Sequence, residues 1–159
     1  MLPLIILAGP TTSKKSDTAI ALAEKLDAEI IGADSMQVYK YFDIGTAKAS
    51  IEDRARIPHH LIDILEPDEE FTAFDFKTRA LKHIRELIGR GKTPVITGGT
   101  GLYLKVLRDD YDCAVQIDPE IKKQVQAEIH ERRLPIMHEE LRRVDPGSAD
   151  RILPGDTQR

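Results

Sequence analysis

Residues 3–8, PLIILA, form an unbroken apolar run that stops at Gly9-Pro10, and a helix-forming segment follows. A run of this length that ends at a glycine is typical of a strand buried on both faces of a parallel sheet. Between Lys15 and Leu26 the apolar residues recur at spacings of three and four, which places them on one face of a helix. The chain therefore opens with a strand–loop–helix unit, the building block of parallel sheets covered by helices.

The same alternation continues to about Arg108. Further strands are expected at residues 28–34, 61–65 and 94–97, and helices after Ser50, from Thr72 to about Gly89 and at about residues 102–107. Two capping patterns, Ser50 with Asp53 and Thr72 with Asp75, support two of these helix starts. Strands that alternate with helices predict an α/β fold with a mainly parallel sheet between layers of flanking helices.

The sequence changes character after about Arg108. An irregular polar stretch leads into two charged helices, expected at residues 119–133 and 135–143, and residues 145–152 begin another helical stretch. We therefore expect an α/β core at residues 1–110 and a small helical insertion at residues 111–159.

Charge and composition exclude several classes of protein. The formal charge of −4 supplies no overall attraction for nucleic acid, so a nucleic-acid partner must meet a local basic patch. The single cysteine, Cys113, excludes an internal disulfide and a thiol zinc site. The chain has no apolar run near the roughly 20 residues of a membrane span, and its start lacks a signal-peptide pattern. We expect a cytoplasmic monomer with no membrane partner.

Residues 9–16, GPTTSKKS, lie between the first expected strand and the first expected helix, which is where a phosphate-binding loop belongs. The pattern GxxxxGK[ST] is met at Gly9, Lys15 and Ser16. Loop N–H groups and the helix N-terminus would bind a di- or triphosphate, Lys15 would neutralise it, and Ser16 would ligate Mg²⁺. The candidate diphosphate-binding residues are Gly9, Pro10, Thr11, Thr12, Ser13, Lys14, Lys15 and Ser16. The alternative is a glycine-rich turn that binds nothing.

Lys14 stands where the loop pattern has its second glycine. A residue with a side chain in the left-handed conformation costs about 1–2 kcal/mol, and this side chain can crowd the anion, whereas its charge attracts the anion. We expect the loop to bind diphosphate weakly and Lys14→Gly to tighten the binding.

Two other groups of residues have ordinary structural explanations. Neighbouring residues of a strand point to opposite faces, so His59 and His60 cannot easily ligate one metal ion and are expected to be structural. Tyr39, Tyr41 and Tyr103 either stack on a base or fill the core, and the core is favoured.

Three further motifs follow the loop in order: ADSMQVYKYFDIGTAK at residues 33–48, PHHLIDI at residues 58–64 and GGTGLY at residues 98–103. Together with GPTTSKKS, and with ADRILPGDTQR at the end of the chain, they resemble the tRNA dimethylallyltransferases, also called tRNA isopentenyltransferases. The resemblance implies a P-loop kinase-like fold. It also implies transfer of the dimethylallyl group of dimethylallyl diphosphate to the exocyclic amine of the adenosine beside the tRNA anticodon, with the loop holding the donor's diphosphate instead of ATP.

The resemblance also assigns residue roles. Asp34 and Thr100 match the family's catalytic acid and a hydroxyl near the reacting amine, and an adenine amine does need a positioned carboxylate because its lone pair is delocalised. The matched tRNA-contact positions are Asp34, Ser35, Met36, Gln37, Thr100, Lys122, Gln158 and Arg159. A capping or structural aspartate is the alternative at Asp34, and a solvated helix face is the alternative at Lys122.

Members of this family are roughly twice as long as this chain, so the helical insertion is expected to be a tRNA-binding part that is cut short. Three alternatives to tRNA prenylation stay open: prenylation of free adenine nucleotides, a small-molecule P-loop kinase, and an inactive truncated remnant. The helical insertion favours tRNA over free nucleotides. Arg132, Arg133, Arg142 and Arg143 could form a patch that faces phosphates, but the glutamates between them make an ordinary helix surface equally plausible.

Overall fold

The computed structural model describes residues 4–9, 13–109 and 118–156. It divides into two compact units, residues 1–114 and residues 115–159. The domain boundary expected after residue 110 falls among residues 110–117, outside the described residues.

The larger unit contains a four-stranded parallel sheet in the order β1-β4-β2-β3. The strands are β1 (Ile5–Ala8), β2 (Ala28–Gly32), β3 (His59–His60) and β4 (Thr93–Gly98). Val95 of β4 lies opposite Ile5 on one side and opposite Ile30 on the other. The parallel α/β sheet predicted from the sequence is confirmed.

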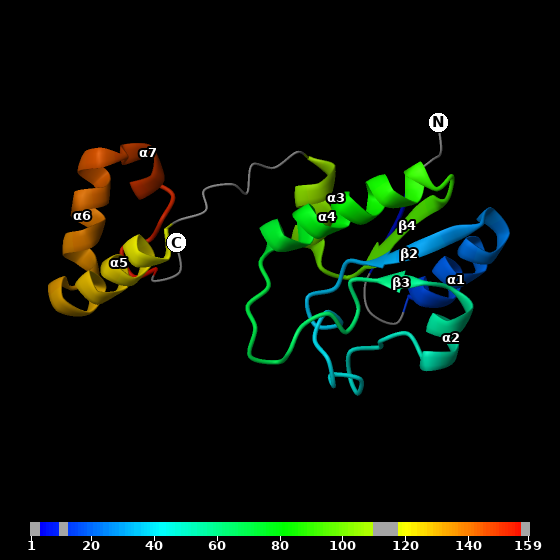
Figure 1. The fold of residues 1–159 in the computed structure, drawn as a ribbon. Helices are drawn as coiled ribbons and strands as arrows, with labels where there is room; N and C mark the ends of the chain where they lie inside the picture. Colours follow the sequence, from blue (N-terminus) through cyan, green and yellow to red (C-terminus); the bar gives the residue numbers. More distant parts are fainter. Residues whose placement is uncertain (1–3, 10–12, 110–117, 157–159) are drawn as a thin grey trace. The chain divides into compact units, whose positions relative to one another are not determined.

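Helices cover both faces of this sheet (Figure 1). They are α1 (Lys15–Leu26) on one face, and α3 (Ala73–Gly89) and α4 (Gly101–Arg108) on the other. The short helix α2 (Ile51–Arg56) has no buried residue. Because strand side chains alternate between faces, Ile30 packs with α1, whereas its neighbour Ile31 packs with α3 and α4. Each face thus has its own apolar cluster, and the expected three-layer arrangement is confirmed.

Local capping sets where two of these helices begin, as the sequence predicts. The Ser50 side chain accepts a hydrogen bond from the Asp53 amide at 3.0 Å. At α3 the bonds are reciprocal, with the Asp75 amide donating to Thr72 Oγ1 at 3.2 Å and the Thr72 amide donating to Asp75 Oδ2 at 2.9 Å. Both helix starts are therefore determined by residues within four positions of each other.

Two strand expectations are wrong. The strand expected at residues 61–65 is replaced by the two-residue β3, because Leu61 and Asp63 have left-handed φ values of 61° and 53° that no extended strand contains. The first strand is not buried on both faces either. β1 lies at an edge of the described sheet with β4 as its neighbour, and Ile6 is 38% exposed.

The smaller unit is helical, with α5 (Pro119–Arg132), α6 (Leu134–Val144) and α7 (Pro146–Ala149), close to the predicted ranges. His138 of α6 is buried, and its Nε2 lies 3.1 Å from the Ala149 carbonyl oxygen and 2.8 Å from that of Ile152. One imidazole thus joins α6 to the segment after α7. Among the described residues, no helix is both long and apolar enough to cross a membrane.

Candidate functional site

Parallel strands bring their carboxyl ends to the same edge of the sheet, and three loops meet there. They follow β1 at Gly9, β2 at Asp34 and β4 at Gly98-Gly99. The approach is close: a Cβ at Gly98 would lie 2.0 Å from the Ala33 carbonyl oxygen. Only glycine fits at Gly98, because any side chain would collide with the backbone of the neighbouring loop.

The loop between β1 and α1 has the strained residue that the sequence predicts. Lys14 has φ 56° and ψ 28°, in the left-handed region, and it caps α1 without a side-chain hydrogen bond to the helix. Its carbonyl accepts hydrogen bonds from the Thr18 amide at 3.1 Å and from Thr18 Oγ1 at 3.0 Å. Lys15 Nζ donates to Ser13 Oγ at 3.4 Å. Pro10, Thr11 and Thr12 lie outside the described residues.

This loop and Asp34 face a common cleft of about 400 Å³. The cleft is lined by residues 13–17, Ile20, Asp34, Gln37, residues 46–50, Asp53 and residues 97–99. It therefore contains the cations Lys14 and Lys15 at the N-terminus of α1, together with a carboxylate from the neighbouring loop. A hypothesis that joins anion binding to carboxylate chemistry requires such a shared cleft, and the structure provides it.

The two carboxylate oxygens of Asp34 have different surroundings. Oδ1 accepts hydrogen bonds from the Met36 amide at 2.9 Å and from the Gln37 amide at 3.3 Å. Oδ2 lies on the side of Gly99, where a built Cβ would be 3.9 Å away. A carboxylate has several acceptor positions, so Asp34 can have both of its expected roles. Oδ1 has the structural, capping role, and Oδ2 is left for a chemical role.

Thr100 joins the loop after β4 to the loop after β2. Its Oγ1 accepts a hydrogen bond from the Ser35 amide at 2.9 Å and donates to Ser35 Oγ at 3.3 Å, while its own amide donates to the Ala33 carbonyl at 3.2 Å. Thr100 and Ser35 are therefore brought next to Asp34, as the sequence predicts, but neither lines the cleft beside the phosphate loop.

A second hollow of about 540 Å³ lies on the other side of Asp34. Its lining is mainly apolar and consists of Asp34, Met36, Tyr41, Phe42, Ile44, Gly45 and Thr46. Ile44 is 98% exposed and Tyr41 is 73% exposed, so the expectation that Tyr41 fills the core is wrong. Tyr41 has a left-handed φ of 66°. This backbone conformation points its side chain in a direction that the sequence pattern does not predict.

Tyr103, by contrast, lies in the core as expected. It is 4% exposed and stacks on Phe76 with ring centroids 4.5 Å apart. Burial raises the pKa of its hydroxyl to about 12, so it stays protonated at physiological pH.

Gln37 and Lys48 have roles that the sequence pattern did not reveal. Gln37 Nε2 donates to the carbonyl oxygens of Thr46 at 2.9 Å and Ala47 at 3.2 Å, so the amide expected to contact tRNA binds its own loop. Lys48 is buried among acceptors, although it lies at the edge of the cleft. No spacing rule predicts these contacts, because the partners come together only through the loop's fold.

The two adjacent histidines have structural contacts, as predicted. His59 Nδ1 lies 2.7 Å from the Ile57 carbonyl oxygen, and burial lowers the pKa of this imidazole. His60 Nε2 lies 2.7 Å from the buried Glu29 carboxylate, and its ring stacks on His83. Among the described residues, no group of three or more His, Cys, Asp or Glu side chains could hold a metal ion.

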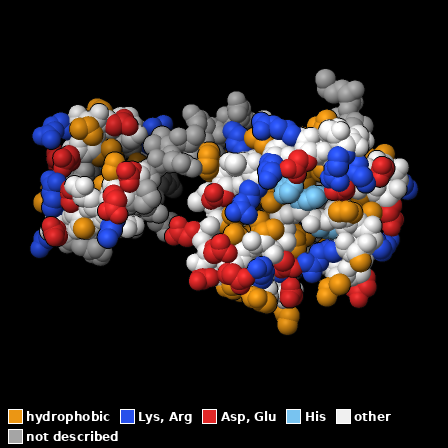
Figure 2. All heavy atoms as spheres, in the orientation of Figure 1, with side chains coloured by type: hydrophobic (Ala, Val, Ile, Leu, Met, Phe, Trp, Pro, Cys, Tyr) orange, Lys and Arg blue, Asp and Glu red, His pale blue; other side chains and the backbone are white. Residues whose placement is uncertain are grey.

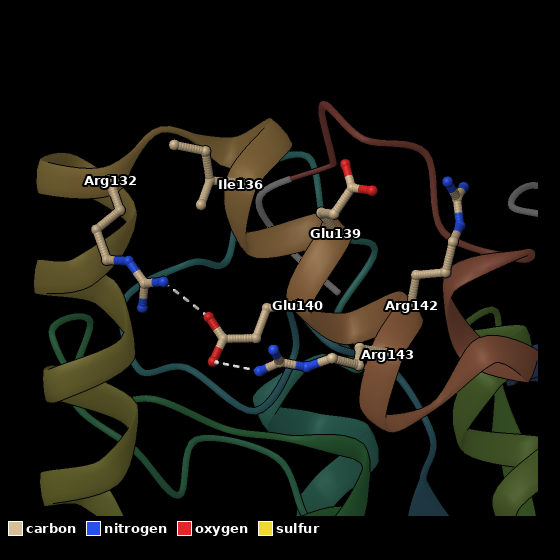
Figure 3. A pocket seen from close by; sticks show the side chains of 6 residues that line it. All are labelled: Arg132, Ile136, Glu139, Glu140, Arg142 and Arg143. Carbon is tan, nitrogen blue, oxygen red and sulfur yellow. Dashed lines mark hydrogen bonds and ion pairs between the residues drawn. The ribbon is translucent and has the colours of Figure 1, made fainter.

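Two arginines of the helical unit, Arg132 and Arg143, pair with glutamates (Figure 3). Arg132 lies 2.9 Å from Glu140 and 3.2 Å from Glu128, and Arg143 lies 4.0 Å from Glu140. Arg132, Glu140 and Arg143 line a mixed-charge hollow of about 440 Å³ between α5 and α6. On the face seen in Figure 2, Lys and Arg side chains are likewise mixed with Asp and Glu. An ordinary helix surface explains this arrangement better than a continuous cationic patch.

Three residues expected to contact tRNA cannot be placed. Lys122 lies within α5, but the structure describes only its backbone. Gln158 and Arg159 lie outside the described residues. Their expected role stays a prediction.

Comparisons with known proteins all point to the same family. The family model for IPP transferases matches residues 37–159. A tRNA dimethylallyltransferase of Syntrophobacter fumaroxidans is 48% identical over 158 residues, which are 99% of this chain and 46% of that protein. One from Alkaliphilus oremlandii is 45% identical over 98% of this chain and 50% of its own length. The chain thus spans about half the length of the curated relatives it matches.

Solved structures show the same likeness. The full-length tRNA isopentenylpyrophosphate transferase of Bacillus halodurans has a TM-score of 0.69 and 36% identity, covering 98% of this chain and 52% of that one. A eukaryotic dimethylallyltransferase described as acting on tRNA has a TM-score of 0.81 and 32% identity, covering 98% of this chain and 39% of that one. At these identities the likeness confirms the expected P-loop kinase-like fold.

Proposed function

The chain belongs to the IPP transferase family, and on that premise we propose that it transfers a dimethylallyl group to tRNA. The donor is dimethylallyl diphosphate, and the acceptor is the exocyclic amine of the adenosine next to the anticodon. The observation that carries the proposal is the single cleft shared by the phosphate loop and Asp34. Family membership favours prenyl transfer over the small-molecule kinase alternative.

The donor's diphosphate suits the cationic side of the cleft. Lys14, Lys15 and the N-terminal amides of α1 lie there, and helix N-termini with lysines bind phosphate groups through charge and N–H donors. Binding the leaving group in this way stabilises the charge that develops on it as the carbon–oxygen bond breaks.

Asp34 lies across the same cleft and acts on the acceptor. The amine nitrogen attacks C1 of the dimethylallyl group, a nitrogen–carbon bond forms, and the C1–oxygen bond breaks with its electron pair leaving on diphosphate. The amine loses one proton, which Asp34 Oδ2 accepts. Because Oδ1 is held by the Met36 and Gln37 amides, Oδ2 has a defined direction in this step.

Magnesium fits the donor set of this cleft. Ser16 lies in the first turn of α1 at the cleft and would hold Mg²⁺ together with diphosphate oxygens and water. The described residues offer no all-protein cage for the ion, which agrees with its preference for phosphate and water ligands. When bound, Mg²⁺ would neutralise negative charge on the diphosphate.

Relatives named for tRNA support tRNA as the macromolecular partner. We propose that the anticodon loop is the part bound, because a single-stranded loop lets the target base turn out into a site. We propose that the helical unit contributes to tRNA contact, that the protein acts as a monomer without a membrane partner, and that its tRNA substrate places its action in the cytoplasm.

The test combines labelled dimethylallyl diphosphate, Mg²⁺ and unmodified tRNA with this chain and with its Asp34→Asn variant. Asp68→Asn changes an exposed turn carboxylate and is the matched control. We expect transfer that Asp34→Asn abolishes and Asp68→Asn leaves unchanged, with inorganic pyrophosphate bound equally by all three proteins. Adenosine monophosphate replaces tRNA in a parallel reaction.

Three outcomes contradict the proposal. Full transfer by Asp34→Asn would remove the carboxylate from the mechanism. Transfer to adenosine monophosphate but not to tRNA would establish the free-nucleotide alternative. A folded chain that transfers nothing would establish the inactive remnant.

A further inference from the structure

The loop between β2 and α2, residues 36–49, forms a wall of both hollows around Asp34. Two of its non-glycine residues, Tyr41 and Ala47, have left-handed φ values of 66° and 50°. The segment that it contacts after β3 has two more, Leu61 and Asp63, at 61° and 53°. Such conformations persist only where surrounding contacts impose them, and they gather at functional sites.

Lys48 provides these contacts. Its side chain is 2% exposed, and its ammonium donates to the Tyr39 carbonyl at 2.9 Å, to Asp43 Oδ1 at 2.9 Å and to Asp63 Oδ1 at 2.6 Å. The three acceptors come from the start of the loop, its middle and the segment after β3. An ammonium has three hydrogens, so all the donors of Lys48 are used.

Asp63 extends the network to α2. Its Oδ2 binds the Arg54 guanidinium, and its amide donates to the Gln37 carbonyl at 3.1 Å. Within the described part of the chain, Arg54 Nε is buried without a hydrogen-bond partner, so the guanidinium is held mainly by Asp63. The loop is thus fixed to α2 and to the segment after β3 through one carboxylate.

Lys48 lines the cleft together with Lys14 and Lys15, and a third cation at a diphosphate site suggests a phosphate ligand. The hydrogen bonds indicate otherwise, because the buried Lys48 ammonium would have to break one of its three hydrogen bonds to reach a phosphate. Removing a buried ammonium from its partners is costly.

We propose that Lys48 is a positioning residue. Together with Asp63 and Arg54 it holds residues 36–49 in their strained conformation, and so keeps Gln37 and Thr46 across the cleft from the phosphate loop. The inference rests on the proposed function only in taking this cleft to be the diphosphate site.

The test compares Lys48→Met, which keeps the length of the side chain, with Lys40→Met. Lys40 belongs to the same loop and also pairs with a carboxylate, Glu66 at 2.6 Å, but the two side chains are 40% and 45% exposed, whereas Lys48 is 2% exposed. Hydrogen exchange is measured for the amides of residues 41–49 and of β2 and β4, the melting temperature is recorded, and binding of inorganic pyrophosphate with Mg²⁺ is measured by calorimetry.

In Lys48→Met we expect loop amides to exchange at least about tenfold faster, while β2 and β4 stay protected. If the loop then occupies its binding conformation about a tenth of the time, pyrophosphate binds about tenfold more weakly. Lys40→Met should change neither quantity.

Weaker pyrophosphate binding with unchanged loop exchange would make Lys48 a direct phosphate ligand and overturn the proposal. Unchanged exchange and unchanged binding would overturn it as well. If Lys48→Met does not fold, Asp63→Asn replaces it, and faster loop exchange is again required. If the unmodified chain binds no pyrophosphate, the donor site of the proposed function fails, while the exchange comparison still decides the role of Lys48.

Discussion

Lys14 occupies a backbone conformation that suits glycine, which makes Lys14→Gly the sharpest perturbation of the candidate site. Its φ of 56° and ψ of 28° lie in the left-handed region, where a side chain costs about 1–2 kcal/mol. Glycine removes this strain, but it makes the unfolded chain more flexible at a cost of about 0.5–1 kcal/mol. The free energy of unfolding should therefore rise by about 0.5–1 kcal/mol, which corresponds to about 1–4 °C in melting temperature.

The same change should tighten pyrophosphate binding. Loss of the Lys14 charge, at an exposed position, costs about 0–1 kcal/mol. Closer approach of the anion allows another loop N–H to bind a charged oxygen, a bond that contributes about 1.5–3 kcal/mol. The net gain is about 0.5–3 kcal/mol, roughly two- to 150-fold in affinity, and isothermal calorimetry with Mg²⁺ measures it.

Two controls separate strain from charge. Asp27 ends α1 with a left-handed φ of 46°, but its carboxylate also pairs with Lys92 Nζ at 3.0 Å, so Asp27→Gly should stabilise the chain less than Lys14→Gly and leave pyrophosphate binding unchanged. Lys14→Ala removes the charge but keeps a Cβ, so it should bind more weakly with no gain in stability. Weaker or equal binding by Lys14→Gly would refute the crowding argument, and an unchanged melting temperature would refute the strain argument.

Other predictions concern stability and pH. Gly98→Ala should lower the free energy of unfolding in urea by about 3 kcal/mol, because its Cβ would lie 2.0 Å from a carbonyl oxygen, whereas Gly89→Ala meets nothing within 4 Å and should not destabilise. Thr72→Ala should cost about 1 kcal/mol by removing the α3 cap, and Thr78→Ala, on the exposed side of the same helix, much less; equal losses would contradict the capping argument. Burial lowers the pKa of His59, so the folded state favours its neutral form, and stability should fall as pH drops below the unfolded value of 6.5. Urea unfolding at pH 7.5 and 5.5 measures this fall, which His59→Gln should reduce, and an equal fall in both proteins would show that His59 is not responsible.

Much of the fold can be predicted from the sequence because the signals are local. The helix from Lys15 to Leu26 follows from apolar residues spaced three and four apart, and the start of α3 follows from Thr72 and Asp75. The left-handed conformation at Lys14 is also predictable, because the phosphate-loop pattern has a glycine at that position.

Interactions between distant segments decide the rest. Leu61 and Asp63 look like strand residues in sequence, yet both have left-handed conformations. Leu61 is buried in an apolar cluster, and Asp63 binds Gln37 and Lys48 of the distant loop. Apolar residues at β1 indicate a strand but not its neighbours, so its place at an edge of the described sheet could not be predicted.

The sequence by itself determined the βα alternation, the helix caps and the residue types of the phosphate loop, because each depends on the backbone preferences of a few neighbouring residues. Only the tertiary structure decided that the loop and Asp34 open into one cleft, that Gly98 must lack a side chain, and that Lys48 binds within the protein. These features depend on which loops meet at one edge of the sheet. Packing brings such loops together, and local periodicity carries no information about which loops become neighbours.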